Sequence, residues 1–126
     1  MAKGRFATAI NCMDGRVQTP VYEYLKNKYK VDYVDMITEP GPNKILAENS
    51  DQVIIASIKR RVEISIHQHG SRSIAIVGHY DCAGNPNSKE VQLEHIKAVK
   101  KLIRSWGFQG ELQGLWVDEN WQVNEV

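Results

Sequence analysis

Short apolar runs alternate along the chain with longer amphipathic segments. Residues 6–11, 33–38 and 73–78 are rich in apolar side chains, and each run predicts a buried strand. Between and after these runs, apolar residues recur at spacings of three and four, which predicts helices. The alternation favours an α/β fold with a mostly parallel sheet of four to five strands, flanked by helices.

Start and stop signals give the expected limits of the helices. Thr19 and Pro20 offer an N-cap and a first helical residue after the first strand. The EPGPNK segment predicts a loop over residues 39–44. A long amphipathic helix then runs from about residue 50 to Gly70, and Asn87 with Glu90 offers the cap of a third helix. The apolar stripe of this third helix consists of Val91, His95, Val99, Leu102 and Trp106.

The tail ELQGLWVDENWQVNEV predicts two short strands around a turn at residues 118–120. Leu115, Trp116, Trp121 and Val123 are more apolar than an edge strand should leave exposed, so we expect a partner subunit to cover them. A chain of 126 residues, 42% hydrophobic, is expected to form a single domain, residues 1–126.

Composition narrows the classes of partner. A net charge of +1 gives no field that would favour nucleic acid or an anionic membrane. The chain shows neither a secretory signal nor an apolar membrane span, so we expect a cytoplasmic protein. In that compartment Cys12 and Cys82 are expected to be reduced thiols, with a disulfide between them as the less favoured alternative.

Three potential metal ligands follow predicted strands. Cys12 ends the first strand, whereas His79 and Cys82 come directly after the third. Ligands of open parallel sheets bind beyond the carboxyl ends of the strands, so these side chains converge if the two strands are neighbours. Two thiolates and one imidazole leave one position of a zinc tetrahedron for water, as in a catalytic site.

Asp14 and Arg16 follow Cys12 at spacings of two. An extended backbone would point all three side chains to one side, with a carboxylate beside the metal and a guanidinium beside the carboxylate. The alternative is an ordinary polar turn with a surface ion pair.

The pattern Cys12-x-Asp14-x-Arg16, followed by His79-x-x-Cys82, resembles the signature of the beta-class carbonic anhydrases. The resemblance runs from about residue 6 to the end of the chain. It implies that Cys12, His79 and Cys82 bind zinc, and that Asp14 and Arg16 form a dyad beside the metal-bound water. The alternative role for Asp14 is to bind the zinc directly and close the site. The implied function is that of a zinc lyase, a carbonate dehydratase that reversibly hydrates carbon dioxide to bicarbonate by a zinc-bound hydroxide. We expect a homodimer or higher homo-oligomer.

The chain departs from the family pattern in two segments. The segment at residues 38–42 stands where an Arg-Asn-Ala-Gly-like segment is usual, and Ala83 stands where glycine usually follows the second cysteine. Neither change removes a ligand, but the chain also lacks the family's N-terminal arm and long insertions. Metal binding is therefore better supported than rapid turnover. Two alternatives stay open: hydrolysis of carbonyl sulfide or carbon disulfide at the same site, and a zinc-binding structural or regulatory protein without catalysis.

Other histidines and glycines have structural explanations. His67 and His69 lie two apart on a predicted helix, point to nearly opposite sides, and are expected at a solvated helix end. His95 lies on an apolar stripe, where a hydrogen-bonded core or interface histidine is expected. Gly41 and Gly84 match no phosphate-binding motif and are expected to turn the backbone.

Overall fold

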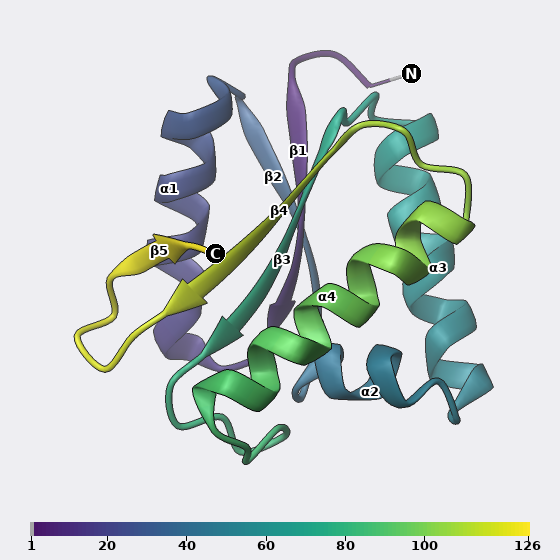
Figure 1. The fold of residues 1–126 in the computed structure, drawn as a ribbon. Coiled ribbons are helices and arrows are strands. Elements are labelled where there is room, and N and C mark those ends of the chain that lie inside the picture. Colours follow the sequence, from purple (N-terminus) through teal and green to yellow (C-terminus); the bar gives the residue numbers. More distant parts are fainter. Residues whose placement is uncertain (1) are drawn as a thin grey trace.

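The computed structural model describes residues 2–126, which form a five-stranded sheet with α-helices on both faces (Figure 1). The strands are β1 (Phe6–Cys12), β2 (Tyr33–Glu39), β3 (Ser73–His79), β4 (Glu111–Val117) and β5 (Val123–Glu125). The helices are α1 (Gln18–Tyr29), α2 (Pro42–Glu48), α3 (Gln52–His67) and α4 (Lys89–Ser105), and a 3-10 helix (Gly15–Val17) precedes α1.

The strands lie in the order β2-β1-β3-β4-β5, and all pairs are parallel except β4 with β5. The predicted fold class is therefore confirmed. β1 and β3 are neighbours, with Ile10 opposite Ile76, so their carboxyl ends lie at the same edge of the sheet. In Figure 1 this edge lies beside α2 and the start of α4.

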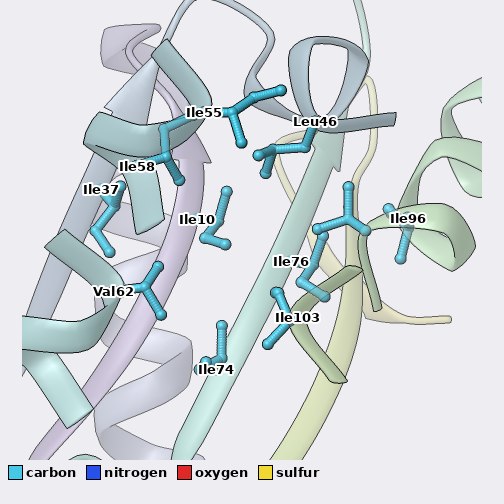
Figure 2. Packing of buried hydrophobic residues seen from close by; sticks show 11 residues of the cluster. Ile10, Ile37, Leu46, Ile55, Ile58, Val62, Ile74, Ile76, Ile96 and Ile103 are labelled. Carbon is cyan, nitrogen blue, oxygen red and sulfur yellow. The ribbon is translucent and has the colours of Figure 1, made fainter. Parts of the chain in front are cut away.

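The two faces of the sheet are packed differently. Along β1 and β3, Ile10 and Ile76 point to the face covered by α2, α3 and α4, where they form a large aliphatic core (Figure 2). Ala9 and Ala75 point to the opposite face, where they contact the apolar side of α1. Strands buried on both faces are typical of parallel sheets with crossover helices, and this burial stabilises the edge that carries the candidate ligands.

Two helix starts differ from the sequence-based expectation. α1 begins at Gln18, directly after the 3-10 helix, so Thr19 is not its N-cap. The predicted loop over residues 39–44 was wrong at its end, because Pro42 is the first residue of α2. Proline is favoured at that position, since the first helical N–H needs no partner and the ring presets the backbone angle.

The third predicted helix was placed correctly, but its cap and buried face were not. Ser88, not Asn87, caps α4 by accepting a hydrogen bond from Val91 N at 3.3 Å. Val91 itself is exposed. The buried residues are Gln92, Ile96, Val99 and Ile103. The buried face is therefore rotated from the predicted stripe, because Gln92 is drawn inward by polar contacts with the loop after β3.

The predicted closing hairpin is confirmed as β4 and β5, but the exposure expected for its apolar residues was wrong. Leu115 and Trp116 are buried within the chain, and Leu115 packs in the apolar cluster against α1. Trp121 and Val123 are partly buried against the α1 face of the sheet. An exposed apolar tail therefore gives no argument for a partner subunit. No helix within residues 2–126 combines the length and apolarity needed to cross a bilayer.

Candidate metal centre

Three side chains that could bind a soft or borderline metal ion converge at the carboxyl edge of the sheet. Cys12 is the last residue of β1, His79 is the last residue of β3, and Cys82 follows in the next loop. Their potential ligand atoms all lie within 4.8 Å of one another. The three side chains are 4%, 1% and 5% exposed, respectively, so a bound ion would be shielded from bulk water on their side.

The spacing of the two sulfurs fits a tetrahedral metal site better than a disulfide. Cys12 Sγ and Cys82 Sγ are 3.8 Å apart, and both cysteines are free. Zn–S bonds of about 2.3 Å at a tetrahedral angle place two sulfurs about 3.8 Å apart, whereas a disulfide requires about 2.05 Å. The hydrogen bond between the sulfurs lowers the pKa of Cys12 and raises that of Cys82.

The imidazole of His79 is oriented for ligation through Nε2. Its Nδ1–H donates to the backbone carbonyl of Tyr80 at 2.8 Å, which leaves the lone pair on Nε2. Nε2 is buried and has no hydrogen-bond partner among residues 2–126. Buried polar atoms without partners are rare, and a metal ion beside the two sulfurs would satisfy this one.

Gln92 and Asn43 support the ligand-bearing strand, and sequence reasoning missed both. Gln92 Oε1 accepts from His79 N at 3.1 Å, and its Nε2 donates to His79 O at 3.0 Å. Asn43 Nδ2 donates to Val77 O at 2.9 Å and so ties α2 to β3. Both side chains are buried, which fixes the backbone around His79. The sequence held no signal for either, because Asn43 falls in the predicted loop over residues 39–44 and Gln92 lies beside the predicted apolar stripe and not in it.

Arg16 and Asp14 form the predicted pair, but not through an extended backbone. The chain turns into the 3-10 helix at Gly15, and Asp14 Oδ1 accepts the backbone N–H of Arg16 at 2.9 Å. Arg16 Nε donates to Oδ1 at 3.0 Å, and Nη2 donates to Oδ2 at 2.6 Å. This two-point contact lowers the pKa of Asp14 to about 2, so the carboxylate is ionised at neutral pH.

Gln18 connects the ligand strand to this turn. Its Nε2 donates to Cys12 O at 2.7 Å and to Asp14 O at 2.8 Å. A residue of α1 thereby fixes the backbone between a candidate ligand and the carboxylate. Because the contact depends on where α1 begins, its start at Gln18 is a feature of the site and not only of the fold.

The remaining histidines lie outside this cluster. His69 is not a solvated helix-end residue as expected, because its Nδ1 contacts Asp35 Oδ2 at 2.6 Å and its ring stacks on Phe6. His67 is exposed. His95 Nδ1 accepts from Asn85 Nδ2 at 3.0 Å, as expected for a hydrogen-bonded histidine.

The family model described as "Putative carbonic anhydrase" matches residues 2–126 of the sequence. The chain belongs to this carbonic anhydrase family. No curated protein matches it in sequence.

Solved carbonic anhydrases share the fold. A tetrameric beta-carbonic anhydrase from the filamentous ascomycete Sordaria macrospora is 12% identical, with a TM-score of 0.59 over 99% of this chain and 82% of that one. The carbonic anhydrase from Glaciozyma antarctica is 13% identical, with a TM-score of 0.54 over 94% of this chain and 80% of that one. The resemblance to the beta-class family drawn from the two cysteine motifs is thus confirmed.

Proposed function

We propose that the chain is a zinc-dependent carbonic anhydrase in which Cys12, His79 and Cys82 hold the metal ion. The observation that carries the proposal is the buried, unpartnered Nε2 of His79 beside two sulfurs at the edge length of a zinc tetrahedron. Zinc bound by three protein ligands lowers the pKa of a water molecule and supplies a nucleophile for the reversible hydration of carbon dioxide to bicarbonate.

The dyad would orient the reacting molecules at the open side of the site. The three ligands are buried, whereas the side chains of Arg16 and Asp14 are 44% and 20% exposed. We propose that substrate enters on the side of the more exposed dyad. Asp14, kept ionised by Arg16, is an acceptor with a fixed direction, and such an acceptor can hold a proton donor in one orientation.

The same site could hydrolyse carbonyl sulfide or carbon disulfide, or it could bind zinc without turnover. The intact dyad favours an enzyme over a structural protein, because a closed structural site has no need of an ionised acceptor beside it. Activity measurements with carbon dioxide, carbonyl sulfide and carbon disulfide would distinguish these substrates.

We propose a homo-oligomer as the working assembly. The solved relative from Sordaria macrospora is described as tetrameric. In this chain, Met13 and Tyr80 lie beside the candidate ligands and are exposed, which a partner subunit would cover. Light scattering at micromolar concentration checks this proposal, and a monomeric mass would contradict it.

Metal content and hydration rate measured on the same sample test the function. We expect about one zinc per chain by elemental analysis and carbon dioxide hydration by stopped flow. His79→Gln should lose both zinc and activity, whereas the matched variant His67→Gln, at an exposed position on α3, should keep both. Zinc with no hydration would leave the non-catalytic alternative, and activity on carbonyl sulfide alone would change the substrate.

A further inference from the structure

Arg16 makes three contacts besides those with Asp14. All three are with residues of two loops at the carboxyl edge of the sheet. Its Nη1 donates to Asp81 Oδ2 at 3.2 Å, and its Nη2 donates to Asp81 O at 3.0 Å. The face of its guanidinium lies 4.5 Å from the ring centre of Trp121. We propose that Asp81 and Trp121 are positioning residues that fix Arg16 and, through it, the carboxylate of Asp14. The catalytic part of this inference rests on the proposed function.

The contacts restrict Arg16 in two different ways. Asp14 and Asp81 engage the edges of the guanidinium, so they define its plane and its rotation within that plane. Trp121 covers one face, which prevents the plane from tilting. An exposed arginine held by a single ion pair samples many rotamers, because such pairs are weak in water. Few rotamers of Arg16 allow contact with Asp14, Asp81 and Trp121 at the same time.

The backbone at Trp121 supports a role for its side chain, whereas an aspartate such as Asp81 tolerates positive φ. Asp81 has φ of +57° and Trp121 has φ of +59°. Glycine or asparagine adopts this conformation at low cost, whereas a bulky side chain rarely does. A tryptophan in such a turn carries a conformational cost, so the contacts of its side chain must offset it.

The turn that presents Trp121 is itself held by hydrogen bonds. Asp118 Oδ1 accepts from Asn120 N at 2.9 Å and from Gln122 N at 3.0 Å, and Asp118 O accepts from Trp121 N at 2.9 Å. Tyr80 N donates to Val117 O at 2.9 Å, which ties the loop of Asp81 to the end of β4. The hairpin of β4 and β5 therefore contacts the dyad through Trp121, in addition to completing the sheet.

The alternative is that Trp121 only fills space, because it also packs against the apolar cluster under α1. The two explanations differ in what they require at position 121. Leucine keeps an apolar side chain at the position but loses volume and the ring, whereas phenylalanine keeps a ring, which contact with the guanidinium face needs. Trp121→Leu and Trp121→Phe therefore separate them.

Matched variants elsewhere in the chain control for the loss of similar groups. Trp106 packs against the other core, and Lys59 lies over its ring at 5.9 Å, so Trp106→Leu controls for Trp121→Leu. Asp81→Asn keeps the backbone carbonyl and tolerates positive φ. Its control is Glu94→Gln, because the side chains of Asp81 and Glu94 are 69% and 70% exposed, each in an ion pair.

Two readouts on folded, zinc-loaded protein test the proposal. The first is hydrogen exchange of the Arg16 Nε–H by NMR, and the second is kcat and KM for carbon dioxide hydration. We expect Trp121→Leu and Asp81→Asn each to speed that exchange about tenfold and to lower kcat about tenfold with KM within about twofold. Trp121→Phe should recover most of both losses, and neither control should show either effect.

The outcomes separate this inference from the proposed function. Faster Arg16 exchange in both variants of a parent that hydrates no carbon dioxide would support the positioning and refute the function. Unchanged exchange and kcat in Trp121→Leu and Asp81→Asn, in an active parent, would overturn the positioning and leave the function intact. Equal losses in Trp121→Leu and Trp106→Leu would assign Trp121 to packing alone. If Trp121→Leu fails to fold, Asp81→Asn against Glu94→Gln decides the outcome.

Discussion

Gly41 and Gly84 bring two loops together backbone against backbone. A Cβ on Gly84 would lie 2.4 Å from the carbonyl carbon of Pro40, and a Cβ on Gly41 would lie 2.5 Å from the carbonyl carbon of Gly84. Real side chains do not approach so closely, so this crossing is available to glycine alone. It places the loop after β2 against the loop that carries Cys82.

Gly84→Ala should therefore damage the candidate metal site. Because the clash is with backbone, the loop of Cys82 must shift, and we expect zinc affinity to fall about tenfold or more and stability to fall by about 1–3 kcal/mol. Competition with a chromogenic chelator and denaturant unfolding measure the two effects. Gly15→Ala is the control, since a Cβ there meets no atom within 4 Å. Parent-like zinc affinity in Gly84→Ala would show that the crossing is not needed.

Asp14→Asn should separate catalysis from folding. Asparagine also caps helices well, so the turn into the 3-10 helix should persist and zinc should stay bound. Loss of the ionised acceptor should lower kcat about 10²-fold, measured by stopped flow at equal zinc content. Asp51→Asn, at the N-cap of α3 and outside the candidate site, should not change kcat. A parent-like rate in Asp14→Asn would reject the dyad mechanism.

His95 should make stability fall in mild acid. Burial lowers the pKa of His95, and of the charged groups that face it Glu48 opposes this shift while Lys44 adds to it. The folded state then binds fewer protons than the unfolded state, so the free energy of unfolding decreases as the pH falls below about 6.5. Replacing the imidazole in His95→Gln keeps an acceptor for Asn85 and should flatten that decrease. Urea unfolding at several pH values measures this effect. If the free energy of unfolding depends on pH in the same way in the parent and in His95→Gln, His95 makes no such contribution.

A buried polar network at the opposite edge of the sheet should contribute to stability. Ser65 Oγ contacts Thr8 Oγ1 at 2.6 Å and donates to Asp35 Oδ2 at 2.7 Å. Ser65→Ala leaves these groups with one partner fewer, so we expect a loss of about 1–3 kcal/mol. Ser57→Ala, at an exposed position of the same helix, should be neutral or slightly stabilising. Equal unfolding midpoints in the two variants would show that the network adds nothing.

The convergence of Cys12, His79 and Cys82 could be predicted from sequence, whereas the residues that support it could not. Cys12 and His79 end apolar runs, and that local pattern alone places them at one edge of a parallel sheet. The partners of Arg16 are different, because Asp81 and Trp121 meet it only through tertiary contacts across the sheet. The pattern of residue types along the sequence therefore could not predict the contacts of Arg16 with Asp81 and Trp121.

Errors in the predicted helices also have physical causes. The EPGPNK segment was interpreted as a loop because two prolines and a glycine usually break structure, yet its second proline starts α2. The buried face of α4 was misplaced because Gln92, a polar residue, turns inward to bond the backbone of His79. The first error overlooked a local preference of proline for the first helical position. In the second, a tertiary contact outweighed the local pattern.

Cys12 and Cys82 lie 70 positions apart in the chain, although their sulfurs touch. During synthesis, Cys12 at the end of β1 therefore leaves the ribosome well before His79 and Cys82 have been made. If the three side chains bind zinc as proposed, metal capture must wait until β3 has been synthesised and paired with β1, so it would come late in biogenesis and stabilise the most distant strand pairing of the sheet. A cell short of zinc should accumulate newly made chains that are slow to commit to this pairing and are exposed to proteolysis.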